Sequence, residues 1–374
     1  MKKSLLLAIP FLLLSSLTSC KNNLKIENIG IIHEPEFGGV YIKKTIEEFN
    51  ELGFSFGDSV NVKFSNGFEI NDLPYYSGYY VDAGESLLVG YPGYDFIKVA
   101  INYGDDMFDI ASLKETDTAS IYLNKKAKYL DIQTALDIHY YDERERYTSD
   151  VEFANYRNIS VGNIKENILY RSASPCDNKH NRASYVDSLM EQSNVQYILN
   201  LADTDEKIQA YIEQDDFNSP YFLSLYQNNG LLTNDKKVNP LAMNMNYTSA
   251  EFASKIAQGF TGMLSSDGPY LVHCLEGKDR TGFVCIVIEA LLGASYQEIV
   301  DDYMLTYKNY YGIDINDPRY KTLKKRNVDS MLQFLTDDDT DITKANLVPH
   351  IESYLQWGGM TEANITAFKA KLSK

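Results

Sequence analysis

The feature that most constrains the fold is the stretch PYLVHCLEGKDRTGFVCIVIEALLG, which spans residues 269–293. A short apolar run comes first, a polar turn with one glycine follows, and a longer apolar run then ends at Gly293. Runs of these lengths predict a buried strand, a tight turn and a buried helix. The stretch therefore indicates a domain in which strands and helices pack in layers.

The same alternation of strand and helix continues through the chain after about residue 150. The segment 183–193 (ASYVDSLMEQS) predicts a helix, 195–203 (VQYILNLAD) predicts a buried strand with a polar loop, and 249–266 (SAEFASKIAQGFTGMLSS) predicts another helix. The C-terminal part is helical in pattern. We therefore expect an α/β fold with a central, mostly parallel sheet flanked by helices.

Residues 31–149 are predicted to form a small β-rich domain. The segment 59–70 alternates apolar and polar residues around an Asn-Gly turn, and 86–101 holds two strand-like runs broken by Pro-Gly. The segment 42–54 predicts a short amphipathic helix that a glycine ends. We place the domain boundary in a charged stretch without periodicity, so that the second domain covers residues 150–374. Nothing in the first domain indicates catalysis.

The N-terminus is typical of an export signal. Lys2 and Lys3 precede an apolar stretch too short to be a stable membrane anchor, and small residues precede Cys20. This arrangement resembles a bacterial lipobox, in which the cysteine is lipidated. We expect a signal peptide over residues 1–19, a lipid on Cys20, a tether over residues 20–30, and a location on the outer face of a bacterial membrane, in the cell envelope. An ordinary secretory signal is the alternative.

The charge of the chain limits its partners. Its 35 basic and 52 acidic residues give a net charge of −17, and removal of residues 1–19 leaves 33 basic residues and a net charge of −19. Such a charge repels nucleic acid and anionic membrane surfaces, so no nucleic-acid partner is expected. A phosphate site in this chain must create its own positive potential.

Cysteine usage argues against a disulfide framework and against a metal site. After Cys20 three cysteines remain, Cys176, Cys274 and Cys285, and an odd number leaves a thiol unpaired. There is no CxxC pair, and the histidines lack ligand spacing, so we expect no structural zinc. The segment 336–348 has three aspartates at calcium-loop spacings but lacks the required glycine and glutamate. No metal or other cofactor is predicted.

The turn CLEGKDR has the composition of an anion-binding site. Where a strand leads through a turn into a helix, the N–H groups of the turn and of the first helical turn converge and favour an anion. Gly277 lets the backbone curl without a Cβ clash, and the local field favours the thiolate form of Cys274. Arg280 offers a planar fork for two oxygens of a tetrahedral anion. These groups predict a nucleophile beside a phosphate-sized site.

Other interpretations explain the turn less well. A nucleotide P-loop is excluded because Val272 stands where the first glycine is required and Asp279 follows Lys278. A purely structural role suits Cys285, which lies in the apolar helix, but does not explain the polar residues around Cys274. A sulfur-transfer enzyme with a cysteine loop remains an alternative.

The segment 273–282 (HCLEGKDRTG) resembles the H-C-x5-R-[ST] signature of cysteine-dependent protein tyrosine phosphatases. Its GKDRTG ending resembles the atypical bacterial tyrosine and dual-specificity phosphatases, several of which also act on phosphoinositides. Residues 153–175 are similar to the family's segment that leads to an L-Y-R-S turn, 195–207 to its next strand and loop, and 302–312 to a C-terminal helix. The resemblance covers roughly residues 150–374 and implies the cysteine-phosphatase fold.

By this resemblance, Cys274 is the nucleophile that forms a phosphocysteine intermediate, and Arg280 holds the phosphoryl oxygens. Thr281 donates a hydrogen bond to the thiolate, and His273 orients the loop. The backbone amides that line the phosphate cradle belong to Leu275, Glu276, Gly277, Lys278 and Asp279.

The general acid that protonates the leaving oxygen has several candidates. Asp279 lies in the loop itself and is our choice, with a salt bridge that closes the loop as its alternative role. Asp203 and Asp205 follow a predicted strand, where NLAD replaces the family's usual acid-leucine-arginine run. Asp235 lies on the loop before the helix that precedes PYLVHC.

The expected substrate is a phosphotyrosine protein, with a phosphoinositide or inositol phosphate as the alternative. A lipoprotein that binds phosphorylated ligands without turnover is the alternative of another class. Lys278 either favours polyphosphorylated head groups or counters the net charge, and Arg171 either supports the loop or pairs with an acid. A reversible bond between Cys176 and Cys274 is a further hypothesis.

Overall fold

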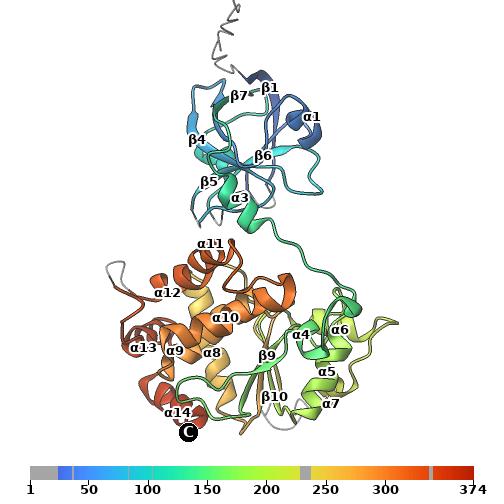
Figure 1. The fold of residues 1–374 in the computed structure, drawn as a ribbon, viewed down its shortest axis with the longest axis vertical. Coiled ribbons are helices and arrows are strands. Elements are labelled where there is room, and N and C mark those ends of the chain that lie inside the picture. Colours follow the sequence, from blue (N-terminus) through green and yellow to red (C-terminus); the bar gives the residue numbers. More distant parts are fainter. Residues whose placement is uncertain (1–23, 36–37, 83, 103, 228–236, 337–339) are drawn as a thin grey trace, which may run out of the picture. The chain divides into compact units, whose positions relative to one another are not determined.

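The computed structural model describes residues 24–35, 38–82, 84–102, 104–227, 237–336 and 340–374 (Figure 1). The chain divides into two compact units, Met1–Gln133 and Thr134–Lys374. The predicted signal peptide, Cys20 and Asp235 lie outside the described residues. Within the part of the chain that is described, no helix is both long and apolar enough to cross a membrane.

The division between the units precedes the predicted boundary at residue 149. The segment that follows Gln133 belongs to the second unit, because Leu136 and Ile138 pack against the core of that unit. The sequence does not reveal this attachment, because Leu136 and Ile138 precede a charged stretch and show no regular apolar spacing.

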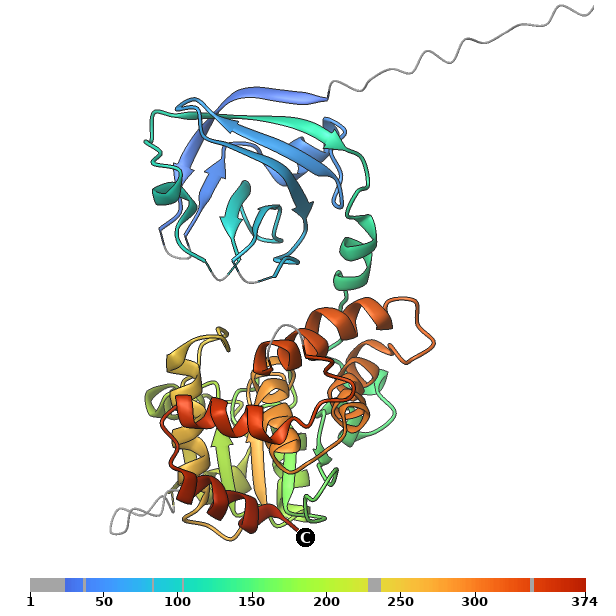
Figure 2. The same cartoon turned by 90° about the vertical axis from the view of Figure 1, so that its left-hand side faces the viewer.

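Figure 2 shows the barrel of the first unit. Seven strands close it, in the order β1-β2-β6-β5-β4-β3-β7. Their bounds are β1 (Lys25–His33), β2 (Val40–Ile42), β3 (Ser59–Phe64), β4 (Glu69–Tyr76), β5 (Ser86–Val89), β6 (Ile97–Ile101) and β7 (Thr118–Lys125). Neighbouring strands are antiparallel except β4 and β5, which are parallel. The β-rich module that the sequence predicts is thus observed.

Two local predictions in this unit have different outcomes. The helix expected over 42–54 is observed as α1 (Ile46–Glu51), where Thr45 forms a capping box with Glu48. The polar tether expected over 20–30 is wrong from Lys25 onward, because β1 begins there and pairs with β7. The remaining helices of this region are α2 (Met107–Ile110) and α3 (Leu130–Leu136), which runs across the division between the units.

The second unit is built on a five-stranded sheet in the order β11-β10-β12-β9-β8. The strands are β8 (Arg157–Asn158), β9 (Leu169–Ser172), β10 (Tyr197–Asn200), β11 (Val238–Pro240) and β12 (Tyr270–His273). Three of the four pairings are parallel, and only β8 runs antiparallel to its neighbour. Parallel strands bring their carboxyl ends to one edge, so residues after β9, β10 and β12 gather there.

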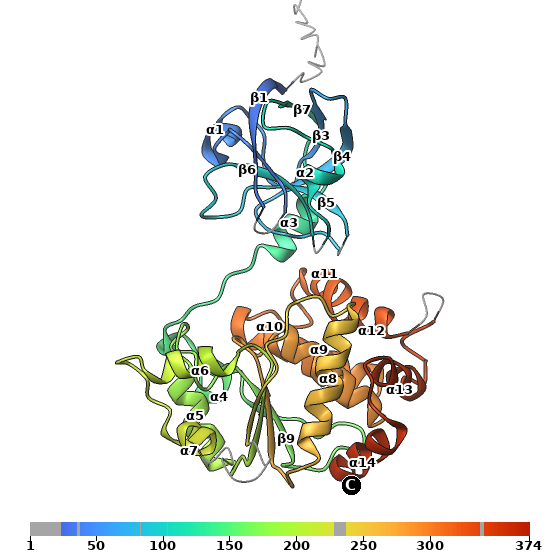
Figure 3. The same ribbon diagram turned by 180° about the vertical axis from the view of Figure 1, so that it is seen from behind.

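Alternate residues of the sheet face two separate cores. On β12, Tyr270 and Val272 belong to one cluster and Leu271 to the other, because successive side chains of a strand point to opposite faces. The Leu271 face is covered by α5 (Ala183–Gln192), α6 (Asp205–Ile212) and α7 (Pro220–Gln227). The unit is therefore a three-layer mixed α/β structure, seen from behind in Figure 3.

The Val272 face carries most of the helices. They are α8 (Ala250–Met263), α9 (Asp279–Leu291), α10 (Tyr296–Tyr311), α11 (Tyr320–Lys324), α12 (Ser330–Leu335), α13 (Val348–Trp357) and α14 (Glu362–Leu372), with the π-helical segment Lys325–Asp329 between α11 and α12. Before β8, the second unit also contains a 3₁₀ turn (Arg144–Arg146) and α4 (Asp150–Phe153).

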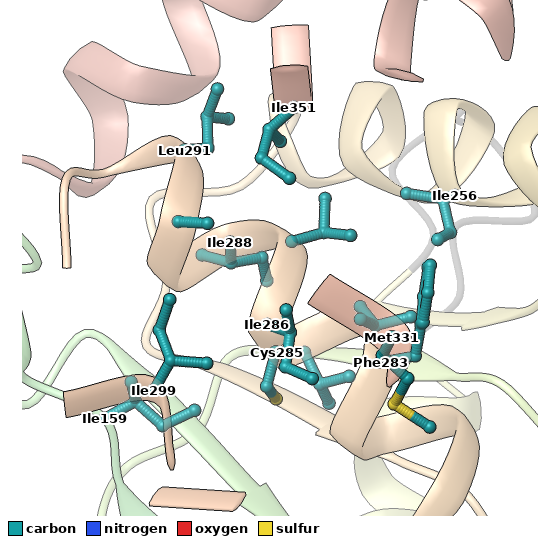
Figure 4. Close-up of a cluster of buried hydrophobic side chains, with 14 of the residues drawn as sticks. Ile159, Ile256, Phe283, Cys285, Ile286, Ile288, Leu291, Ile299, Met331 and Ile351 are labelled. Carbon is teal, nitrogen blue, oxygen red and sulfur yellow. The ribbon is translucent and has the colours of Figure 1, made fainter. Parts of the chain in front are cut away.

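Helix α9 lies at the centre of the larger core. Its residues from Thr281 to Leu291 are all buried, and Figure 4 shows Cys285 among the apolar side chains of this cluster. A helix buried on all sides holds its N-terminus in a fixed position. Since the turn CLEGKDR leads into this N-terminus, the core fixes the place of the turn.

Candidate active site

The turn joins the end of β12 at His273 to the start of α9 at Asp279, the strand–turn–helix unit that the sequence predicts. Gly277 has φ +66, and a Cβ there would lie 2.2 Å from the carbonyl oxygen of Ser172. Both the positive φ and the close approach to β9 require glycine. We call residues 274–280 the phosphate loop.

Three consecutive carbonyl oxygens of the phosphate loop are held from outside. The bonds run from Ser174 N–H to Leu275 O (2.9 Å), from Tyr310 Oη to Glu276 O (2.7 Å), and from Arg171 Nη2 (2.9 Å) and Asn155 Nδ2 (3.2 Å) to Gly277 O.

This outward bonding determines where the loop amides face. In a trans peptide the N–H of the next residue lies opposite the carbonyl, so the amides of Glu276, Gly277 and Lys278 face away from these partners. No amide of residues 275–279 donates to another residue in the described ranges. The amides therefore remain available to a bound anion, at the N-terminus of α9.

Cys274 and Arg280 lie at the two ends of the phosphate loop. Cys274 is a free thiol with only 3% of its surface exposed. Arg280 donates from Nη1 to the carbonyl oxygen of Met243 (3.0 Å), and its buried Nε finds no partner among the described residues. One end of the guanidinium is thus fixed by the protein while another donor stays open to a ligand.

His273 and Thr281 flank the loop and are fully buried. Burial lowers the pKa of His273 to about 4, so its imidazole is neutral at ordinary pH, and Nδ1 lies 3.3 Å from the carbonyl oxygen of Cys274. Thr281 Oγ1 is buried without a hydrogen-bond partner in the described part of the chain. The bond from Thr281 to the sulfur of Cys274 that the resemblance implies is therefore not formed in this structure.

Lys278 is surrounded by acidic and phenolic groups. Its Nζ lies 3.5 Å from Glu276, 3.7 Å from Asp279 and 3.3 Å from the hydroxyl of Tyr311. Burial acts to lower the pKa of Lys278, but Asp279 and Glu276 raise it well above its ordinary value overall. The charge of Lys278 is thus compensated by neighbouring residues of the loop.

The candidate acids occupy different environments. Burial raises the pKa of Asp279, although Lys278 acts in the opposite direction. Burial also raises the pKa of Asp203, which accepts a hydrogen bond from Asn200 Nδ2 (3.0 Å). Asp205 begins α6 and accepts from the hydroxyl of Tyr226 at 3.3 Å. Asp279 is the candidate within the phosphate loop, and it is partly exposed, whereas Asp203 is buried.

A buried polar network supports the loop from behind. Arg171 on β9 pairs with Asp302 of α10 (2.5 Å), and Asp302 also pairs with Arg157 (2.6 Å). Burial acts to raise the pKa of Asp302, but the two guanidinium groups hold it well below its usual range. Arg171 thus fills both roles foreseen for it, since it pairs with an acid and also binds Gly277 O.

Several supporting residues carry no signal in the sequence. Asn155, at φ +49, donates to both Gly277 O and Thr306 Oγ1, and Tyr310 binds the loop from α10. Asparagine in a left-handed conformation is a weak clue to a special turn. Nothing local connects these residues to the loop, since Asn155 lies 122 positions before Gly277 and Tyr310 lies 34 positions after Glu276.

The other two cysteines lie in separate surroundings. Cys285 is fully buried within α9, as the structural role predicts. Cys176 and Cys274 belong to the two hydrophobic cores on opposite faces of the sheet. Burial raises the pKa of the Cys176 thiol. In the described ranges no group of three or more metal-ligating side chains gathers.

Comparisons with known proteins place this site in a family. Residues 150–374 match the tyrosine phosphatase family. The search of curated proteins found no match to this chain. A conserved protein of unknown role from Thermotoga maritima is 26% identical over 26% of this chain and 35% of its own, with a TM-score of 0.22. This chain thus spans about a third of that protein's length.

A second solved structure is the core catalytic domain of the PP-IP phosphatase SIW14 from S. cerevisiae in complex with citrate. It is 17% identical over 49% of this chain and 96% of its own, with a TM-score of 0.25. At such TM-scores neither likeness carries weight for the fold or the function. The family match covers more than half of the chain and includes the whole phosphate loop. The chain therefore belongs to the tyrosine phosphatase family.

Proposed function

We propose that this protein is a cysteine-dependent phosphoric monoester hydrolase that acts through a phosphocysteine intermediate. Membership of the tyrosine phosphatase family supports phosphatase activity. The observation that carries the proposal is the outward bonding of the carbonyls of Leu275, Glu276 and Gly277, which leaves a set of unpaired amides beside Cys274.

In the first step the sulfur of Cys274 attacks phosphorus, and the ester bond to the leaving oxygen breaks. The loop amides and Arg280 bind the three other phosphoryl oxygens, where negative charge gathers in the transition state. In the second step water attacks the phosphocysteine, the S–P bond breaks, and the thiolate leaves. The buried Thr281 hydroxyl, which lacks another partner in the described structure, is free to rotate toward that leaving sulfur.

We assign the general acid to Asp279. It gives its proton to the leaving oxygen in the first step and accepts a proton from water in the second. Its raised pKa suits this exchange, because the carboxyl stays protonated to a higher pH than an ordinary aspartate. His273 has the supporting role of orienting the loop through the carbonyl of Cys274.

We propose phosphotyrosine in proteins as the substrate. A polyphosphorylated inositol requires cations beyond those that bind the first phosphate. Lys278 is a poor candidate for that task, because Glu276 and Asp279 already surround its ammonium group. Phosphotyrosine needs only the single phosphate site that the loop and Arg280 provide.

The decisive experiment is the hydrolysis of p-nitrophenyl phosphate by the wild type and by Cys274→Ser. We expect vanadate-sensitive turnover in the wild type and loss of turnover in the variant. Cys285→Ala is the matched control, since Cys285 is buried and lies outside the phosphate loop, and it should retain activity. Turnover that survives Cys274→Ser would remove the proposal.

The substrate class needs a separate assay. A phosphotyrosine peptide, a phosphoinositide and a soluble inositol phosphate should be compared by kcat/KM on the same enzyme. We expect the peptide to be preferred. A higher kcat/KM for either inositol compound would reassign the substrate without affecting the chemistry.

We also propose that the protein is exported and anchored by a lipid on Cys20. The support is the sequence alone, in which Lys2 and Lys3, a short apolar stretch and small residues precede the cysteine. Globomycin should block processing in a bacterial host, and Cys20→Ala should release the protein from the membrane fraction. Processing that is indifferent to globomycin would leave plain secretion.

A further inference from the structure

A side chain from outside the family match contacts the phosphate loop. Tyr140 precedes residues 150–374, yet its hydroxyl donates a hydrogen bond of 2.8 Å to Oε1 of Glu276. Both residues belong to the unit Thr134–Lys374. The loop thus has a partner from the segment that leads into the family domain.

The ring of Tyr140 is held on the outer side of the loop. It stacks on Tyr310 with ring centroids 5.2 Å apart, and Tyr310 is the residue that binds the outward carbonyl of Glu276. The guanidinium of Arg182 lies 4.9 Å from the centroid of each of these two rings. Arg182 in turn donates to Asp142 at 2.7 Å, so the segment is also bound two residues after Tyr140.

Glu276 is an unusual side chain for a loop that binds anions. Burial acts to raise its pKa, but Lys278 and the Tyr140 hydroxyl lower it overall, so the carboxylate is charged. The pKa of Tyr140 is raised by burial and by Glu276, so the phenol keeps its proton and remains a donor. Without the bond from Tyr140, Glu276 keeps its 3.5 Å ion pair with Lys278 on the other carboxylate oxygen. A carboxylate that then turned toward the loop amides would repel phosphate and could accept bonds from those amides itself.

We propose that Tyr140 is a positioning residue that holds the Glu276 carboxylate on the outer side of the phosphate loop and so sets the affinity of the site for phosphate. The inference rests on the proposed function in one respect, namely that residues 274–280 bind the phosphate anion. It assigns a role in that site to a segment that the family match does not include.

The test is a double-mutant cycle on phosphate binding in the full-length protein. The dissociation constant of inorganic phosphate is measured by isothermal titration calorimetry for the wild type, Tyr140→Phe, Glu276→Gln and the double variant. Tyr140→Phe should weaken binding by about tenfold, the effect expected when a charged group loses a hydrogen bond. In the Glu276→Gln background, residue 276 carries no negative charge that could repel phosphate. Tyr140→Phe should there weaken phosphate binding by less than about twofold.

The control for local stability is Tyr147→Phe. Tyr147 lies in the same segment, and its hydroxyl donates to the carbonyl of Tyr141 and accepts from Arg182. The variant therefore perturbs the surroundings of Tyr140 and leaves the bond from Tyr140 to Glu276 in place. This variant should bind phosphate like the wild type. If Tyr140 only supported folding, its loss would reduce the active fraction, and hence kcat, without changing the dissociation constant.

The outcomes separate this inference from the proposed function. If Tyr140→Phe weakens phosphate binding equally with and without Glu276→Gln, Tyr140 does not act through Glu276. The same conclusion follows if Tyr140→Phe alone leaves phosphate binding unchanged. If the two substitutions are coupled in phosphate binding as expected but the wild type hydrolyses no phosphate ester, the proposed phosphatase activity is refuted and the role of Tyr140 stands. A wild-type protein that does not bind phosphate overturns both.

Discussion

Arg171 Nη2 donates a hydrogen bond of 2.9 Å to the carbonyl oxygen of Gly277, while Nη1 of the same side chain binds Asp302. One planar guanidinium therefore connects the phosphate loop to α10. Lysine has a single ammonium group and cannot reproduce the two fixed directions of this fork. The loop backbone is thus oriented by a residue that lies outside the loop, on β9.

Replacement of Arg171 by lysine should impair both stability and catalysis. We expect the free energy of unfolding to fall by about 3 kcal/mol, because a buried charge pair loses its geometry, and kcat/KM to fall by at least about tenfold. Urea unfolding and p-nitrophenyl phosphate kinetics measure the two effects. Arg319→Lys is the control, since Arg319 pairs with Asp317 at the surface, and a change above about 1 kcal/mol there would undermine the argument.

Gly277→Ala tests the close approach of the loop to β9. Gly277 and Gly312 both have φ +66, but a Cβ on Gly277 would lie 2.2 Å from Ser172 O, whereas a Cβ on Gly312 would have nothing within 4 Å. Gly312→Ala should therefore lose about 1 kcal/mol from backbone strain alone. Gly277→Ala should lose roughly 3 kcal/mol or more and abolish turnover, since the backbone must shift. Equal losses of stability in thermal unfolding would show that the contact with Ser172 does not matter.

The neutral, buried His273 should make stability depend on pH. Its pKa is about 4 in the folded protein and ordinarily 6.5, so the unfolded chain binds a proton in this window that the folded chain does not. The free energy of unfolding therefore falls as the pH is lowered from 6.5 to 4. The complete contribution of His273 to this fall is roughly 3 kcal/mol.

The His273→Asn variant lacks this contribution while keeping a donor near the Cys274 carbonyl. Its free energy of unfolding, measured in urea between pH 7 and 4, should fall less steeply than that of the wild type. His139→Asn, in which an exposed side chain is changed, should follow the wild-type slope. Parallel curves for His273→Asn and the wild type would contradict the predicted titration.

The assignment of the general acid predicts a dependence on the leaving group. Phenyl phosphate needs its leaving oxygen protonated far more than p-nitrophenyl phosphate does. Asp279→Asn should therefore lower kcat for phenyl phosphate by about 100-fold and for p-nitrophenyl phosphate by less than about tenfold. The same pattern in Asp203→Asn, with Asp279→Asn unaffected, would transfer the role to Asp203.

Much of the fold of the second unit could be predicted because its signals are local. The short apolar run before Cys274 and the long one after Arg280 differ in length as a strand and a helix do, and β12 and α9 are observed there. The early end of the first unit could not be predicted, because Leu136 and Ile138 show no periodicity before they pack on a core formed by distant residues.

The candidate site divides in the same way. The sequence alone determined that a cysteine, a glycine and an arginine share one turn before a buried helix, because that spacing is written in seven consecutive residues, 274–280. Only the tertiary structure decided that Arg171, Asn155 and Tyr310 hold the carbonyls of this turn outward. These contacts arise when parallel strands and the helices beside them bring distant segments to one sheet edge, and no local pattern of residues encodes which side chains then meet.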